Sequence, residues 1–166
     1  EEYEFIDEAL ATGMGEAVDA VSFHMYETDE RKIFHFVDAI GADVRCYNPK
    51  AAIIQGESGS QSRSDGNGAL RGGSWTKLKQ AKQLLRHTVA LLSTDVLFTS
   101  YFSCVDMIEG LKGKVSDKAS YQDYGYFGVL GAQFDEEGHS IGTYEPKPSY
   151  YALQNLAALL SDEVIS

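Results

Sequence analysis

The sequence predicts an α/β fold built on a parallel sheet. Along the 166 residues, apolar positions alternate between helical spacing and short continuous runs. The resulting order is one helix and then three strand-plus-helix units, which is the order that right-handed crossovers produce. No internal repeat or low-complexity linker divides the chain. We therefore expect residues 1–166 to form one domain or one piece of a domain.

Each element follows from a local pattern. Strands are predicted where apolar residues run without Gly or Pro, and helices where apolar residues recur every three to four positions. Gly13 is a plausible C-cap of the first helix, and Pro148 suits the first position of the last. The expected elements are a helix at 2–12, a strand at 18–26, a helix at 31–43, a strand at 51–55, a helix at 76–92, a strand at 96–104 and a helix at 148–160.

Two side-chain patterns predict burial. The helix at 76–92 carries the best apolar stripe in the chain, and such a stripe usually faces the core. Cys46 and Cys104 both have apolar neighbours in the sequence, which favours buried free thiols, with a single disulfide left open. The members of the stripe are Leu78, Ala81, Leu85, Val89 and Leu92.

The number of strands leaves two architectures open. Three strands are too few to close a (β/α)₈ barrel, so the chain is either an incomplete barrel or a small open sheet complete in itself. A dinucleotide-binding sheet is not expected, because Gly66-Asn67-Gly68 is followed by Arg71 where a third glycine would be needed. No GxxxxGK[ST] phosphate loop is present either.

Composition excludes several kinds of partner. The net charge is −11, and the 14 basic residues are scattered, so neither nucleic acid nor an anionic membrane surface is an expected partner. No apolar stretch reaches the roughly 18 residues of a membrane span, and no secretory signal is visible. Two cysteines exclude a cysteine-based zinc site, and no other metal-ligand spacing is recognised. We predict no metal and no cofactor, whereas an uncharged ligand such as a sugar is compatible.

Polar and aromatic residues follow all three predicted strands. The first strand ends in His24-Met25-Tyr26, the second in Gln55-Gly56-Glu57, and the third in Thr99-Ser100-Tyr101-Phe102. Parallel α/β sheets place their sites at the carboxyl ends of the strands. The sequence therefore predicts that a carboxylate, an imidazole and several aromatic side chains meet at one edge.

These motifs resemble the clan A glycoside hydrolases. The segment Ile53-Ile54-Gln55-Gly56-Glu57-Ser58-Gly59 is similar to their seventh strand, and Ser22-Phe23-His24-Met25-Tyr26 is similar to their sixth. The end of the chain also resembles theirs, in Tyr126-Phe127-Gly128-Val129-Leu130 and in a last helix that begins at Lys147-Pro148. The resemblance covers nearly the whole chain. It implies the C-terminal part of one (β/α)₈-barrel domain, with the last three strand–helix units and the helix before them.

The resemblance also implies a chemistry. In the family, a Glu ending the seventh strand attacks the anomeric carbon, and a second, protonated carboxyl releases the leaving group with net retention. Glu57 would be that nucleophile. Tyr26 and His24 would donate hydrogen bonds that orient it. Tyr101 and Trp75 would offer aromatic faces to a sugar. Trp75 directly follows Ser74, which is the expected N-cap of the next helix.

Two departures from the family pattern keep other functions open. The family's acid/base, usually in Asn-Glu after the fourth strand, has no counterpart here, and neither Glu27 nor Asp106 is expected to replace it. Tyr101-Phe102 stands where a Trp usually ends the eighth strand. A non-catalytic carbohydrate-binding pseudoenzyme is one alternative. The other is an α/β domain that associates with itself through unpaired strand edges.

Overall fold

A computed structural model describes residues 2–65, 68–110, 121–123, 126–135 and 138–160. The chain divides into two compact units. The first consists of Glu1–Ser58 and His87–Ser100, and the second of Gly59–Arg86 and Tyr101–Ser166. The boundaries cut through the helix predicted at 76–92, which therefore contributes one part to each unit.

The first unit contains most of the predicted helices and strands. The first helix ends near the expected place, because Gly13 adopts a φ of 98°, a left-handed conformation that glycine reaches without steric cost. The elements are α1 (Glu2–Ala9), a π-helical turn (Leu10–Met14), α2 (Gly15–Ala17), β1 (Ala20–His24), α3 (Glu30–Tyr47), β2 (Ala52–Ser58), the end of α4 (Lys77–Leu92) and β3 (Val96–Tyr101), whose last residue belongs to the second unit.

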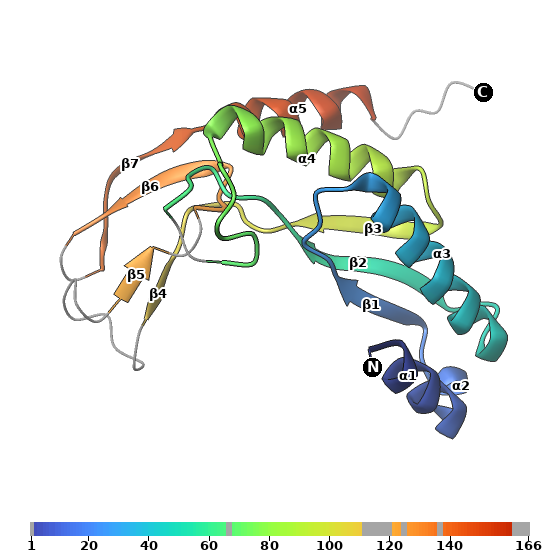
Figure 1. Cartoon of the computed structure of the whole chain (residues 1–166). Helices are drawn as coiled ribbons and strands as arrows, with labels where there is room; N and C mark the ends of the chain where they lie inside the picture. Colours follow the sequence, from blue (N-terminus) through green and yellow to red (C-terminus); the bar gives the residue numbers. More distant parts are fainter. Residues whose placement is uncertain (1, 66–67, 111–120, 124–125, 136–137, 161–166) are drawn as a thin grey trace. The chain divides into compact units, whose positions relative to one another are not determined.

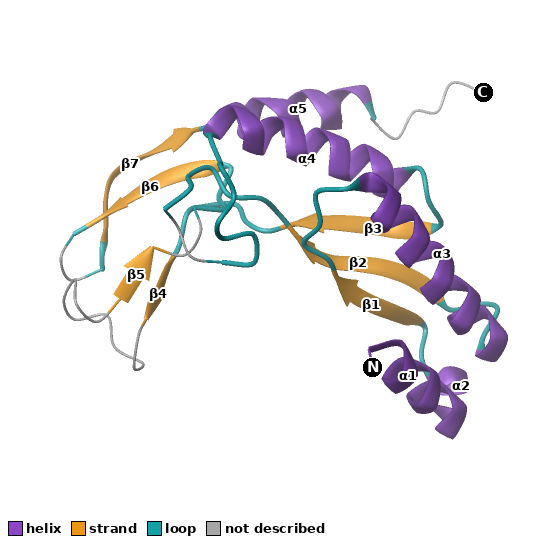
Figure 2. Ribbon diagram, in the orientation of Figure 1, coloured by secondary structure: helices purple, strands orange, loops and turns teal. Residues whose placement is uncertain are grey.

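The strands form the three-stranded sheet that the sequence predicts. Their spatial order is β1-β2-β3, β1 pairs with β2 in parallel, and the arrows of all three run the same way in Figure 1. Both connections are helical, as parallel neighbours require (Figure 2). Asp29 caps α3 by accepting a hydrogen bond from the Arg31 amide at 3.0 Å.

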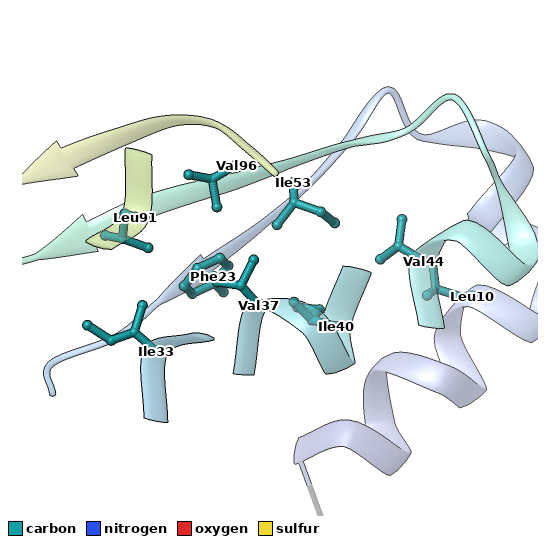
Figure 3. Packing of buried hydrophobic residues seen from close by; sticks show 9 residues of the cluster. All are labelled: Leu10, Phe23, Ile33, Val37, Ile40, Val44, Ile53, Leu91 and Val96. Carbon is teal, nitrogen blue, oxygen red and sulfur yellow. The ribbon is translucent and has the colours of Figure 1, made fainter. Parts of the chain in front are cut away.

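The core of this unit lies between the sheet and the apolar face of α3 (Figure 3). The α3 side chains recur at helical spacing and are 2% exposed or less, while the strands supply Phe23, Ile53 and Val96. Burying each of these side chains contributes about 1.5–3 kcal/mol. The complete cluster is Leu10, Phe23, Ile33, Val37, Ile40, Val44, Ile53, Leu91 and Val96.

Within its described residues, the second unit contains four short strands that apolar periodicity did not predict. β4 (Ile108–Gly110) pairs antiparallel with β5 (Tyr121–Asp123), and β6 (Leu130–Phe134) pairs antiparallel with β7 (Ser140–Pro146). Every residue of β7 is exposed, so this strand has no buried face to create an alternating pattern. α5 (Pro148–Leu159) begins at Pro148 as predicted.

Polar side chains occupy much of the interior of the second unit. The buried Gln80 amide nitrogen lies 2.9–3.3 Å from the carbonyl oxygens of Ser60, Tyr126, Phe127 and Gly128. Its Oε1 accepts a hydrogen bond from the Ser149 hydroxyl at 2.9 Å. One glutamine of α4 thus joins two loop segments to the start of α5.

A buried ion pair supports the same unit. The Lys147 ammonium donates to Asp106 Oδ1 at 2.6 Å, to the Ser62 hydroxyl at 2.9 Å and to the Tyr126 carbonyl at 3.2 Å. Asp106 also accepts from the Gly128 amide at 2.9 Å. Burial raises the pKa of Asp106 and lowers that of Lys147, and the contact between them opposes both shifts.

The predicted buried face of α4 is wrong. Leu78, Leu85, Val89 and Leu92 are 36–59% exposed, and only Ala81 of the predicted stripe is buried. The face that is buried includes Gln80, Leu84, His87 and Leu91. Its spacing is helical, but two of these four residues are polar, so a search for apolar periodicity passes over it.

The burial predicted for the cysteines is also wrong. Cys46 and Cys104 are both free thiols, and both are exposed. Cys46 lies at the end of α3, beyond the stripe that faces the core. Apolar neighbours in sequence therefore did not indicate which side of the helix the thiol would occupy.

Candidate active site

Glu57 lies next to the ends of two strands in the first unit. It is the sixth residue of β2, which extends to Ser58 and so is longer than the predicted strand at 51–55. Its partner across the β1–β2 ladder is His24, and the Met25 amide donates to the Glu57 carbonyl at 3.0 Å. Hydrogen bonds on the main chain thus fix where the Glu57 side chain begins.

The Glu57 carboxylate has two polar neighbours. The Tyr26 hydroxyl donates to Oε1 at 2.6 Å, a short hydrogen bond of the kind that a charged acceptor makes. His24 Nδ1 lies 3.7 Å from Oε2, which is too long for a hydrogen bond, so this contact is an ion pair when the imidazole is protonated. The Glu57 side chain is 36% exposed and the His24 side chain 60%. The structure therefore brings Glu57, Tyr26 and His24 together on an accessible surface.

Glu27 follows this group in sequence but is held as a base rather than a proton donor. Its carboxylate accepts from the amides of Thr28 and Asp29 at 2.7 and 3.1 Å and from the Lys32 ammonium at 3.0 Å. Burial alone would raise the pKa of Glu27, but these hydrogen bonds outweigh it and lower the pKa below its usual value. A general acid needs the opposite shift.

Tyr101 and Trp75, the two predicted sugar-stacking residues, belong to the second unit. The Tyr101 hydroxyl donates to the Ser60 carbonyl at 3.3 Å, and burial raises the pKa of Tyr101 to about 12. Trp75 is only 5% exposed, and its indole nitrogen donates to the Leu70 carbonyl at 3.0 Å. Neither ring is presented as an open stacking surface.

The start of the helix after Trp75 differs from the prediction. Ser74 was expected to cap it, but the Thr76 hydroxyl accepts the hydrogen bond from the Lys79 amide, at 3.1 Å. The side-chain ammonium of Lys79 lies 4.6 Å from the centre of the Trp75 ring, and this cation–π contact covers the indole further.

Gln55 is a supporting residue to which the sequence motif alone assigned no role. It is fully buried, and its Oε1 accepts from the Thr99 hydroxyl at 2.8 Å and from the Ser100 amide at 3.1 Å. These bonds tie the end of β2 to β3. The signal in the sequence was a lone amide side chain closing an apolar run, which is costly unless the amide is hydrogen-bonded.

Two other features of the described residues concern metal binding and membrane spanning. Within the described ranges, no group of three or more His, Cys, Asp or Glu side chains is arranged to hold a metal ion. The helices in those ranges include none that is long and apolar enough to cross a bilayer.

Comparisons with known proteins find a likeness in fold. No protein-family model matches the chain, and no curated protein does. Among solved structures, a β-D-glucuronidase of Dictyoglomus thermophilum matches 87% of the chain with a TM-score of 0.55 and 18% identity. A GH2 β-galacturonidase of Eisenbergiella tayi, bound to galacturonate, matches 87% with a TM-score of 0.58 and 13% identity, and a Ruminococcus gnavus β-glucuronidase matches 89% with 0.55 and 13%.

The chain folds like part of these glycosidases. It spans 23%, 24% and 23% of the three matched chains, respectively. At such low identities the likeness concerns the fold alone. It agrees with the predicted α/β architecture.

Proposed function

We propose that this chain is part of a glycoside hydrolase that cleaves O-glycosidic bonds with retention, and that Glu57 is its nucleophile. The observation that carries the proposal is the Glu57 carboxylate at a strand end, accessible and hydrogen-bonded by Tyr26 at 2.6 Å. The fold likeness to glycosidases supports the same assignment. In this proposal, residues 1–166 form the C-terminal part of a single (β/α)₈ barrel.

The chemistry assigns one role to each residue of the site. Glu57 Oε2, the oxygen not bound by Tyr26, attacks the anomeric carbon and forms a covalent glycosyl ester as the leaving oxygen departs. Tyr26 holds the carboxylate in one rotamer through its bond to Oε1. His24 lies beside Oε2 and borders the space where the sugar would bind.

The proton for the leaving group has to come from a second carboxyl about 5 Å from the nucleophile. The hydrogen bond and the ion-pair contact of Glu57 come from a phenol and an imidazole, and neither of these is a carboxyl group. We assign the acid/base to a segment outside these 166 residues. This fragment alone is then expected to be inactive.

The test uses the longest natural protein that contains this segment and a panel of aryl glycosides, glucuronides and galacturonides included, because the structural neighbours carry those names. Glu57→Ala should lower kcat by at least 10³-fold, and added azide should restore turnover as a glycosyl azide of inverted anomeric configuration. Glu16→Gln is the matched control, since Glu16 is an exposed carboxylate in α2. Full activity of Glu57→Ala would overturn the assignment.

A non-catalytic carbohydrate-binding protein is the second candidate, favoured by the lowered pKa of Glu27, which makes this carboxylate a poor proton donor. This candidate predicts that the full-length protein has no turnover. It also predicts that Glu57→Gln changes the dissociation constant for the sugar by no more than about threefold. Self-association is a further possibility for the isolated chain. Leu97 and Phe98 on β3 are 68% and 49% exposed, and sedimentation of the 166-residue chain would reveal it.

A further inference from the structure

Between two successive pairs of the β1–β2 ladder, strand β2 contains one extra residue. Phe23 pairs with Gln55, but the next residue of β1, His24, pairs with Glu57. One step along β1 therefore corresponds to two steps along β2, and the extra residue is Gly56. Two residues opposite one is the definition of a β-bulge.

The bulge changes the face on which Glu57 lies. Before it, Ile53 and Gln55 are 3% and 0% exposed, and Gln55 pairs with Phe23 of the core. Side chains alternate along a regular strand, so residues 55 and 57 would lie on the same face if Gly56 were an ordinary ladder residue. The carboxylate of Glu57 would then share the buried side with Gln55. With the bulge, Glu57 pairs with His24, and its side chain reaches the exposed site.

The strand is held on both sides of the bulge by the same residue of β3. The Gln55 carboxamide accepts from the Ser100 amide at 3.1 Å, and the Ser58 hydroxyl donates to the Ser100 carbonyl at 3.2 Å. These two side-chain contacts tie the residues on either side of Gly56 and Glu57 to one residue of β3.

Glycine meets a requirement of space at this position. A Cβ on residue 56 would run into the Ser22 hydroxyl oxygen and would lie 3.5 Å from two atoms of the His24 ring. The φ of Gly56 is outside the left-handed region, so an alanine there is allowed by conformation and opposed only by Ser22.

We propose that Gly56 is a positioning residue: its bulge turns the Glu57 carboxylate from the buried face of β2 to the face of His24 and Tyr26. That this position of Glu57 serves catalysis rests on the proposed function, whereas the bulge itself is independent of that function. The proposal predicts that adding a methyl group at Gly56 uncouples Glu57 from Tyr26, and that removing the Ser22 hydroxyl restores the coupling.

The experiment measures that coupling without using activity. Tyr26→Phe, Glu57→Gln and their combination form a double-mutant cycle on the unfolding equilibrium constant, repeated in Gly56→Ala, Ser22→Ala and Gly56→Ala/Ser22→Ala backgrounds. A part-buried hydrogen bond to a carboxylate should couple the two residues by about tenfold. We expect about tenfold in the unchanged protein and in Ser22→Ala, twofold or less in Gly56→Ala, and recovery in the combined background.

Each outcome decides the proposal. Unchanged coupling in Gly56→Ala would overturn it, because Glu57 would then tolerate a side chain in the bulge. If Gly56→Ala does not fold, the combined variant decides: tenfold coupling supports the role of Gly56, and absent coupling refutes it. A cycle that behaves as expected while Glu57→Ala retains full turnover would refute the proposed function and leave the bulge proposal standing.

Discussion

Removing the Lys147 ammonium should destabilise the second unit strongly. The Lys147 and Asp106 side chains are 2% and 5% exposed, and their N–O distance is 2.6 Å. Lys147→Met would remove the ammonium that contacts the buried Asp106 carboxylate. Breaking one partner of such a pair costs about 3–5 kcal/mol, which is roughly 10²- to 10³-fold or more in the unfolding equilibrium constant.

Urea unfolding followed by tryptophan fluorescence measures this cost. Trp75 is the single tryptophan and lies in the same unit as the ion pair. The midpoint should fall by about 1–3 M urea. Arg63→Met is the matched control in that unit, because the Arg63–Asp65 pair is 50% and 64% exposed and should contribute less than about 1 kcal/mol.

A compensating variant isolates the cause. Lys147→Met/Asp106→Asn removes both charges and keeps an oxygen for the Gly128 amide, so it should recover at least half of the lost stability. The reasoning is refuted if Lys147→Met costs no more than Arg63→Met, or if the double variant is no more stable than the single one.

Three other predictions concern burial in each unit. Burial raises the pKa of Tyr101 to about 12, so the folded state keeps the phenol proton above pH 10 while the unfolded chain loses it. The free energy of unfolding should therefore fall by roughly 2–3 kcal/mol between pH 10 and 12. Tyr101→Phe should flatten this part of a plot of the urea midpoint against pH. Burial lowers the pKa of His87, so stability should be fully present above pH 6.5 and fall as the pH drops below it, and His87→Gln should remove this slope. Leu91→Ala should cost about 2–5 kcal/mol by thermal or urea unfolding, whereas its neighbour Leu92→Ala, 46% exposed, should cost less than about 1 kcal/mol; equal losses would contradict the buried face of α4.

Periodicity predicted the three strands of the first unit and the helices that connect them, but not the buried face of α4. Three apolar runs and the helices between them appear close to the predicted places, because each run buries side chains against a helix and so leaves a pattern in the sequence. The candidate site was accessible to the same reasoning. His24 and Glu57 lie at the ends of β1 and β2, Tyr26 comes two residues after β1, and parallel strands bring their carboxyl ends to one edge.

Interactions between distant residues decided the remaining features. The sequence by itself determined a parallel α/β sheet and a carboxylate at the end of its second strand. Only the tertiary structure showed that Gln80 faces inward, since its amide donates to carbonyl groups of one loop 20 residues away, at Ser60, and of another 46–48 residues away, at 126–128. Only the pairing of β1 with β2 revealed the bulge at Gly56, because register is a relation between two strands and neither one records it alone.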